Sequence, residues 1–321
     1  MESKMDFDIH QLRIFIEVVR SGSFSKAAER LNLSQSAVSQ SIGKLEKQLN
    51  LTLIDRVARP FQLTKAGRLL LDRSQTILHA VDTLSYDIKL IDGQRPNLRI
   101  ACCGFFGMTV FPLLVESLLK HVDQLRGFTG HTPTVCQMLQ NRTVDMAISS
   151  SPMSNVPTVQ SVPLYDESFL IVAPREVSQP IRTHHDLKVK LGHLPLIRYN
   201  DSTLDYLEIE RILRYCEIDS DKRVQMNMDA ATMELVAQGY GWSIMPSSGI
   251  WSVRHYLNSV QLLNLPEFKF SRKIYLNYQD SSFKSLADLI EKETKHAIQN
   301  SLLPQMVKAD TIFQKAFIFA R

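Results

Sequence analysis

The fold is decided by the stretch Ser34-Gln35-Ser36-Ala37-Val38-Ser39-Gln40-Ser41-Ile42-Gly43-Lys44-Leu45-Glu46-Lys47-Gln48-Leu49. Its apolar residues recur at helical spacing and form one continuous stripe. The hydroxyl of Ser34 suits the N-cap of this helix. The opposite face carries short hydrogen-bonding side chains at its start and a cation further along. A helix of this kind suits the major groove of DNA, with its N-terminus toward the base edges.

The flanking residues predict a small winged module around this helix. Apolar residues at helical spacing predict a first helix over 9–19, and a second follows over 25–31 after a break at 21–23. Residues 51–63 alternate in polarity and predict a two-stranded wing with Arg56 and Arg59 near its tip. An ordinary solvated surface is the competing interpretation of each polar face, and the combination of two helices and a tight turn favours DNA binding.

The charge of the chain is concentrated in this module. Ten basic and four acidic residues lie between Arg20 and Arg73, whereas the whole chain has a net charge of only +4. The rest is therefore net acidic, which indicates a polyanion-binding module joined to a part with another task. We expect DNA contacts from the following residues: Ser34, Gln35, Ser36, Ser39, Gln40, Lys44, Arg56 and Arg59.

These residues resemble a known family. The runs at 11–15, 22–31, 34–40, 45–46 and 63–67 are similar to the DNA-binding signature of LysR-type transcription regulators, over about sixty residues without gaps. The resemblance implies a bacterial regulator whose recognition helix and wing contact double-stranded operator DNA. Ser36 and Gln40 depart from the commonest pattern, which often has proline and arginine there, so the base preference of relatives does not carry over.

A long helix is predicted after Thr64. Its apolar positions step alternately by four and three residues and are interrupted only by Ser74. Such a seam favours a second copy of the same helix, although packing within one chain is the alternative. We expect a homodimer, and from it a homotetramer, held by the following residues: Leu70, Ile77, Val81, Leu84, Ile88 and Ile91. Gly93 and Pro96 then mark a boundary.

From residue 98 the pattern changes to alternating strands and helices, which predicts parallel sheets flanked by helices. Strands are expected over 98–102, 124–128 and 144–148, with helices over 111–122 and 134–139. A second set begins near Phe169, with strands over 195–199, 224–228 and 242–245 and helices over 204–215 and 230–238. A strand over 272–278 and a helix over 283–299 return to the first lobe.

Two such lobes resemble the effector domain of the same family, which is similar to periplasmic binding proteins. The predicted fold is therefore a multidomain α/β protein with a winged helix-turn-helix over 1–64, a linker helix and hinge over 65–95, and an effector-binding domain over 96–300. Its two lobes would be 96–166 with 269–300, and 167–268. Residues 301–321 lie beyond the resemblance, and their apolar side chains suggest that they cover a groove or a neighbouring subunit.

A small-molecule effector is expected between the lobes. Ligands of open α/β sheets lie beyond the carboxyl ends of the strands, where helix N-termini present free N–H groups. The candidate residues follow the predicted strands, and the paired phenylalanines suggest an apolar part of the ligand; they are Cys103, Gly104, Phe105, Phe106, Thr129, Gly130, Ser149, Ser150, Tyr199, Asn200 and Asp229. Each has a competing interpretation as a turn residue or helix cap.

Other functions remain as alternatives. Cys102 or Cys103, with Cys136 as partner, or the eleven methionines, could sense oxidants instead of a metabolite. An α/β enzyme fused to a DNA-binding head is more remote, because no GxSxG, HExxH, P-loop or GxGxxG motif occurs. We expect no catalytic residue, cofactor or metal site. No apolar run reaches the roughly 18 residues of a membrane helix, so we expect a cytoplasmic protein without membrane contact, with RNA polymerase as a further partner.

Overall fold

The structure, a computed structural model, describes residues 7–58, 60–91, 95–177, 181–201, 203–218, 224–264, 270–279 and 281–319. The chain divides into two compact units near Gln94. The first contains Met1–Gln94, and the second contains nearly all residues from Arg95 onward. The linker helix belongs to the first unit, and each unit is described by itself.

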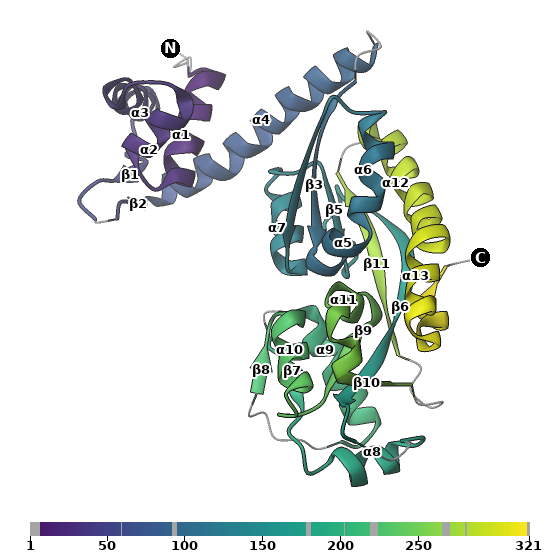
Figure 1. Cartoon of the computed structure of the whole chain (residues 1–321). Coiled ribbons are helices and arrows are strands. Elements are labelled where there is room, and N and C mark those ends of the chain that lie inside the picture. Colours follow the sequence, from purple (N-terminus) through teal and green to yellow (C-terminus); the bar gives the residue numbers. More distant parts are fainter. Residues whose placement is uncertain are drawn as a thin grey trace. The chain divides into compact units, whose positions relative to one another are not determined.

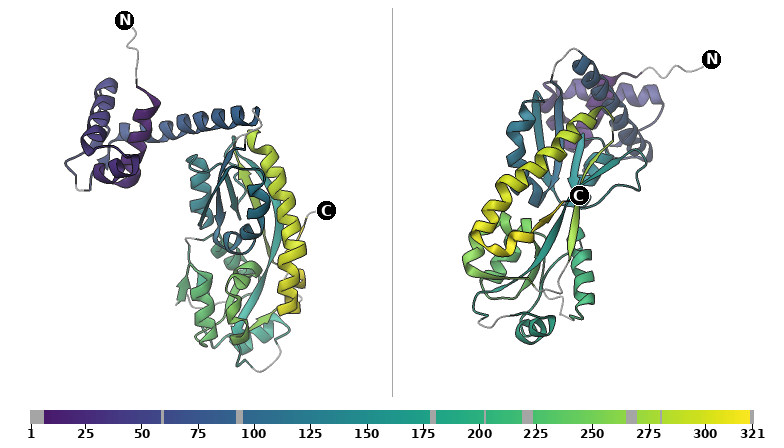
Figure 2. Two further views of the ribbon diagram at one scale, coloured as in Figure 1. Left: turned by 45° about the horizontal axis from the view of Figure 1, so that its top comes forward. Right: turned by 90° about the vertical axis from the view of Figure 1, so that its right-hand side faces the viewer.

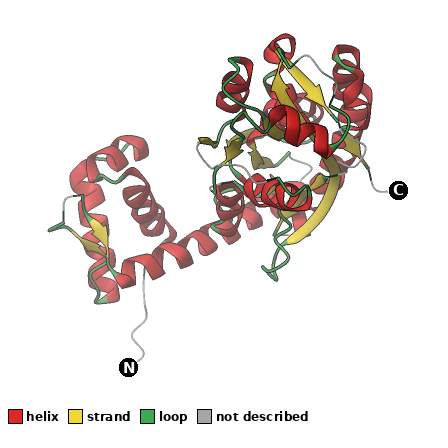
Figure 3. Ribbon diagram, turned by 90° about the horizontal axis from the view of Figure 1, so that it is seen from below, coloured by secondary structure: helices red, strands yellow, loops and turns green. Residues whose placement is uncertain are grey.

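The first unit is a winged helix-turn-helix (Figure 3). Its helices are α1 (Ile9–Ser21), α2 (Phe24–Leu31) and α3 (Gln35–Leu49), and its wing is the antiparallel pair β1 (Ile54–Asp55) and β2 (Gln62–Leu63). The helices begin at side-chain caps, because Asp8, Ser23 and Ser34 each accept a hydrogen bond from a backbone N–H of the first turn. The predicted apolar stripe of α3 forms the core with α1 and α2.

Helix α4 (Lys65–Ile91) starts from the wing. Thr64 caps it, since the Gly67 amide donates to Thr64 Oγ1 over 3.0 Å. Gly67 has a strict steric role: a Cβ there would lie 2.1 Å from the carbonyl oxygen of Leu53. Leu70 packs partly against the core of its own head, and Ser74, the polar exception in the seam, is buried. Ile77, Leu84 and Ile88 are exposed.

The second unit consists of two lobes (Figure 1). In the first lobe, β3 (Asn97–Cys103) pairs in parallel with β4 (Gln124–Gly130) and β5 (Met146–Ser149). The covering helices are α5 (Gly104–Thr109), α6 (Phe111–Leu119), α7 (Thr132–Gln140) and α12 (Lys284–Ala297). The ends of β3, β4 and β5 therefore lie at one edge, where α5 and α7 begin.

The second lobe contains the parallel pair β7 (Ile197–Tyr199) and β8 (Val224–Met226), and the strands β9 (Ser243–Pro246) and β10 (Val260–Leu263). Its helices are α8 (His184–Leu191), α9 (Leu204–Tyr215), α10 (Asp229–Ala237) and α11 (Ser247–Ser252). Helix α9 has the predicted bounds. Four short elements, α5, α8, α11 and β10, were not predicted from the sequence, because they lack a clear periodic pattern.

Two long strands connect the lobes. Strand β6 (Gln160–Pro174) pairs along its first part with β11 (Ser271–Tyr278), and along its last part with β9 and β10. Strand β11 also pairs with β5 of the first lobe. One continuous strand thus belongs to the sheets of both lobes, which confirms the predicted two-lobed α/β architecture.

The residues after 300 continue the second unit rather than leaving it. A π-helical turn, Ile298–Leu302, joins α12 to α13 (Leu303–Ala309), and β12 (Phe317–Ile318) then pairs with β6 at Asp166 and Glu167. Figure 2 shows α12 and α13 running alongside the lobes in both views. The segment adds a strand to the connecting strand of its own chain. Its suggested contact with a neighbouring subunit stays a prediction.

We expect this tail to carry much of the stability of the second unit. Phe313 is fully buried and contacts Trp251 edge-to-face with ring centroids 6.1 Å apart. Phe313→Ala should lower the free energy of unfolding by about 3 to 5 kcal/mol, because it leaves a cavity. Ile318→Ala is the matched control, since Ile318 lies on the same tail and is 53% exposed. Urea unfolding followed by tryptophan fluorescence reports this unit, because both tryptophans, Trp242 and Trp251, lie in it; equal effects of the two substitutions would contradict the assignment.

Candidate functional site

A shallow groove in the first unit lies between the start of α3 and the wing. Its lining includes Gln35, Ser39 and Arg56, together with the apolar residues Phe24, Ala58, Pro60 and Phe61. The rings of Phe24 and Phe61 meet edge-to-face with centroids 5.7 Å apart, which fixes the wing against α2. The structure thus brings together three of the predicted DNA-contacting residues.

Glu46 holds the wing to α3, a role that the sequence analysis did not recognise. Its Oε1 accepts from the backbone amides of Leu53 over 2.8 Å and Ile54 over 3.2 Å. Its Oε2 pairs with Arg56 Nη2 at 3.2 Å, and the Arg56 guanidinium lies 5.2 Å from the centroid of the Phe24 ring. Arg56 is therefore positioned by an acid and an aromatic ring while its side chain stays about half exposed.

The remaining predicted residues of the head occupy the exposed face of α3. Gln35, Ser36, Gln40 and Lys44 are exposed. Ser34 is exposed too, but its hydroxyl accepts from the Ala37 amide over 3.1 Å and lies 2.9 Å from Ser36 Oγ, so it serves first as the cap. Arg59 lies outside the described residues.

A cavity of about 210 Å³ lies between the two lobes of the second unit. Seven of the predicted effector residues line it: Cys103, Gly104, Phe105, Gly130, Ser150, Tyr199 and Asp229. The first five come from the carboxyl ends of β3, β4 and β5, and the last two come from β7 and the start of α10. The sequence rule about strand ends therefore identified this edge of both lobes.

Four predicted effector residues do not line the cavity. Phe106 is fully buried in the core behind it. Ser149 is also buried, and it is hydrogen-bonded to Asn277 Nδ2 at 3.0 Å and to the Ser151 carbonyl at 2.9 Å. Thr129 lies on the edge strand β4 beside Gly107, and the Asn200 amide donates to the Met226 carbonyl next to the β7–β8 pairing. The rule gives the position of each strand end but not the direction of each side chain, so it does not separate these four residues from those that line the cavity.

The cavity also has lining residues that the sequence analysis missed. Some are neighbours of selected residues along the chain: His131, Thr132, Asn227, Met228 and Ala230. Others come from separate segments: Met108, Thr203, Leu204, Asp205, Ser252 and Val253. Asp205 had a signal, since it lies in the first turn of the predicted helix 204–215. Ser252 and Val253 lie at the end of α11, a helix that was not predicted.

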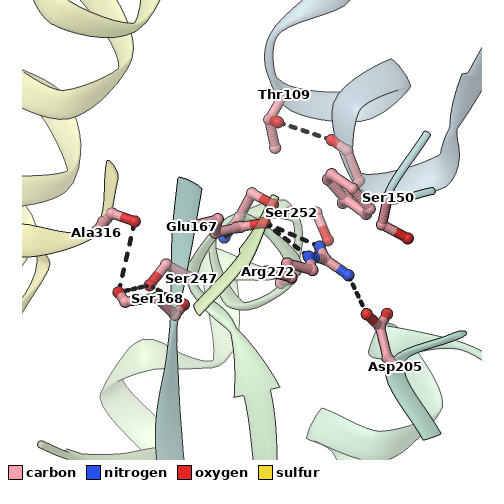
Figure 4. A network of polar contacts seen from close by, with 12 residues as sticks. Thr109, Ser150, Glu167, Ser168, Asp205, Ser247, Ser252, Arg272 and Ala316 are labelled. Carbon is pink, nitrogen blue, oxygen red and sulfur yellow. Dashed lines mark hydrogen bonds and ion pairs between the residues drawn. The ribbon is translucent and has the colours of Figure 1, made fainter. Parts of the chain in front are cut away.

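A buried ion-pair network borders the cavity (Figure 4). Arg272 on β11 pairs through Nη2 with Glu167 Oε2 on β6 at 2.9 Å, and its Nη1 donates to Asp205 on α9. Its guanidinium lies 3.7 Å from the centroid of the Phe105 ring of the first lobe. Glu167 is fully buried and also accepts from the Ser248 amide. One cation thus links both connecting strands, α9 and α5.

The tail reaches this network through serine hydroxyls. The carbonyl of Ala316 accepts from the Ser168 amide over 2.9 Å, and Ser168 Oγ lies 3.1 Å from Ser247 Oγ (Figure 4). Ser247 begins α11, whose end contributes Ser252 to the cavity. Hydrogen bonds through Ser168 and Ser247 therefore connect the tail to α11, which borders the cavity.

A second acid of the cavity lies in an environment unfavourable to its charge. Asp229 Oδ1 accepts a hydrogen bond from the Tyr199 hydroxyl. Burial raises the pKa of Asp229, and the nearby carboxylates of Asp205 and Glu167 raise it further, whereas Tyr199 and Arg272 oppose the shift. Burial and the Asp229 charge also raise the pKa of Tyr199. Tyr199 is therefore the proton donor of this pair.

The cysteines are poorly suited to fast oxidation. Cys102 and Cys103 are buried, and burial raises the pKa of both thiols well above their usual value. Cys136 is partly exposed, but burial raises its pKa as well, and its thiol donates to Ser149 Oγ at 3.5 Å. All four cysteines belong to the described chain, and none of them is in a disulfide.

None of the described helices is both long and apolar enough to cross a membrane. No cluster of three or more His, Cys, Asp or Glu side chains in the part of the chain that the structure describes could hold a metal ion.

Both units match families of known proteins. Residues 9–68 match the family described as bacterial regulatory helix-turn-helix protein, lysR family, and residues 92–290 match the LysR substrate binding domain. A probable RuBisCO transcriptional regulator of Phaeodactylum tricornutum is 26% identical over 88% of this chain and 94% of its own. The HTH-type transcriptional activator CmpR of Synechocystis is 25% identical, over 87% of this chain and 91% of its own.

Solved structures have the same fold at low sequence identity. Full-length CbnR in complex with its target DNA superimposes with a TM-score of 0.64 at 18% identity, covering 91% of this chain and all of CbnR. An OxyR mutant of Corynebacterium glutamicum with bound hydrogen peroxide has a TM-score of 0.59 at 23% identity, covering 98% of this chain and 97% of that one.

Thiol burial leads to a prediction about reactivity. In the native chain at neutral pH, iodoacetamide should modify Cys136 first and leave Cys102 and Cys103 unmodified until the chain is unfolded, because the thiolate is the reactive form and burial suppresses it. Peptide mass spectrometry after timed quenching measures each site, and urea-unfolded chain is the control. Rapid native labelling of Cys102 or Cys103 would contradict the assigned environments.

Proposed function

Because the chain belongs to the LysR family of DNA-binding transcription regulators with an effector-binding domain, we propose that the α3 and wing groove binds operator DNA and that the cavity between the lobes holds the switching effector. The observation that carries the proposal is the convergence of Gln35, Ser39 and Arg56 on one groove. Polar side chains at the start of a helix reach base edges, while a flanking cation reaches phosphates.

Charge supports double-stranded DNA as the partner of the head. The segment from Arg20 to Arg73 has a net charge of +6. Arg56 lines the groove, and Lys44 is exposed on α3. Cations that contact phosphates provide sequence-independent affinity that falls with salt. The proposed contact surface also includes Ser34, Ser36, Gln40 and Arg59. We propose that the three parts of the chain are the DNA-binding domain 1–64, the linker 65–95 and the effector-binding domain 96–300.

We infer a homodimer built through α4, and a homotetramer as its further assembly. Ile77, Leu84 and Ile88 are exposed apolar residues on one seam of the helix, which a second α4 would cover. Val81 lies between them, and Leu70 is shared with the head core. The side chain of Ile91 lies outside the described residues.

The proposed switch is a closure of the two lobes on the effector. It would change the spacing of the DNA-binding heads in a pair of dimers, provided that the effector binds one arrangement better than the other. The protein would act in the bacterial cytoplasm and affect transcription through RNA polymerase. A catalytic role is not proposed, because the family consists of regulators.

Redox sensing is a second candidate with one specific observation in its favour. The probable hydrogen peroxide-inducible genes activator of Mycobacterium leprae is 27% identical over 78% of this chain and 82% of its own. The raised pKa values of Cys102, Cys103 and Cys136 argue against the same chemistry in this chain. We therefore favour a small-molecule effector.

The DNA-contact proposal predicts two different mutant behaviours. Gln35→Ala should cost about 1 to 3 kcal/mol at one base pair and relax specificity there. Lys44→Ala should weaken binding to all duplexes alike and reduce the salt slope by about one. Fluorescence anisotropy with the adjacent promoter region, single-base variants of it and a scrambled duplex measures both. Failure of the unmutated chain to retain its own promoter at low salt would overturn the proposed function, and equal losses on every duplex would overturn the roles.

The seam predicts the oligomeric state. Leu84→Glu should shift the chain toward monomer and lower its apparent operator affinity, because a charge on the seam cannot be buried at a helix pair without a partner. Ser85→Glu is the matched control on the next residue of the same helix and should remain dimeric. Sedimentation velocity measures the distribution, and an unchanged dimer in Leu84→Glu would place the interface elsewhere.

A further inference from the structure

We propose that the effector carries a cationic amine group, which binds in the cavity against the carboxylates of Asp205 and Asp229. This inference rests on the proposed effector site and adds the chemical class of its ligand. It follows from which charges face the cavity and which of their atoms already have partners.

The charged lining of the cavity is predominantly acidic. Asp205 and Asp229 face it from the starts of α9 and α10, and neither lysine nor arginine is among its described lining residues. The further titratable side chains among the lining residues are His131, Tyr199 and Cys103. Ser150 and Thr132 next to it are neutral hydroxyls, which suit an uncharged or weakly polar part of a ligand.

Each carboxylate has one oxygen that accepts no hydrogen bond from the described residues. Within the part of the chain that the structure describes, Asp229 receives one hydrogen bond, from the Tyr199 hydroxyl to Oδ1. Asp205 is bonded through Oδ1 to Arg272. Among the described residues, Oδ2 of each acid has no hydrogen-bond partner. An ammonium group could therefore donate a hydrogen bond to either carboxylate or to both.

The side-chain charges around the cavity leave a net negative excess. Glu167, Asp205 and Asp229 are three acids around one base, Arg272, whose Nε, Nη1 and Nη2 already face Glu167 and Asp205. Burying an excess of negative charge is costly unless a cation pairs with it. Burial raises the pKa of Asp229, and the carboxylates of Asp205 and Glu167 raise it further. An amine would offset this negative excess, whereas a carboxylate ligand would add to it.

The same geometry connects the ligand to both lobes. An ammonium beside Asp205 would compete with Arg272 for that carboxylate. Arg272 also pairs with Glu167 on β6 and lies over Phe105 of the first lobe. A change in the contacts of Arg272 would therefore alter its pairing with the connecting strand β6 and its contact with Phe105 on the opposite wall of the cavity. Both contacts lie between the parts that would move when the lobes close.

The test compares three probes of equal chain length with the full chain at pH 7.5. Isothermal titration calorimetry and thermal unfolding are measured with butane-1,4-diamine, 4-aminobutanoate and butanedioate. We expect at least one of the two amines to bind and raise the unfolding temperature, and butanedioate to have no effect. Binding of butanedioate alone would overturn the amine class while leaving an effector site, and absence of binding by both amines would overturn it too. Operator binding by the same preparation shows separately whether the proposed function stands.

Two variants distinguish ligand binding from structure. Asp229→Asn keeps an acceptor for Tyr199 but removes the charge, so amine affinity should fall at least tenfold while the unfolding temperature of the unliganded chain stays the same or rises. A purely structural Asp229 would instead lower that temperature. Asp288→Asn is the control, because Asp288 is an exposed acid on α12 and its loss should change neither value. Undiminished amine binding by Asp229→Asn would also overturn the proposal.

Discussion

The second unit depends on the burial of one positive charge. Arg272 is 4% exposed and lies on a strand that connects the lobes, so its charge must be compensated by the protein itself. Glu167, Asp205 and the ring of Phe105 provide that compensation from three other elements. Removing a single partner would leave an uncompensated charge, which is far more costly than losing a surface ion pair. The positions of β6, β11, α5 and α9 are thus tied to one guanidinium.

The same constraint explains why the cavity is acidic. A site that must neutralise Arg272 needs carboxylates at its border, and the first turn of α9 supplies Asp205. Asp229 adds a further acid whose charge is not needed for Arg272. Structural compensation and ligand recognition therefore share the same wall, and the effector is expected to contribute to the electrostatic balance that the fold leaves incomplete.

The sequence predicts the head better than the cavity, for a physical reason. Caps such as Ser34 and the stripe from Val38 to Leu49 are local, so they can be recognised from neighbouring residues. The ends of β3, β5 and β7 could also be predicted from the sequence, and they identified Cys103, Ser150 and Tyr199. The pairing of Glu167, Asp205 and Arg272 was not, because it joins residues far apart in sequence and has no periodic pattern. Ser149 and Ser150 show the same limit, since successive residues at a strand end face opposite directions.

The pairing of β12 with β6 has a consequence for synthesis. Strand β6 is rich in apolar residues, and it obtains its partners β9, β10, β11 and β12 only from segments made later. About 150 residues separate Glu167 from Ile318, so at the usual 5 to 20 residues per second the ribosome needs roughly 8 to 30 seconds to deliver the last partner. During that time an unpaired edge is open to other chains, because backbone N–H and C=O groups of a free strand can pair with any extended segment. Nascent chains of this protein should therefore depend on holding chaperones until the tail has emerged.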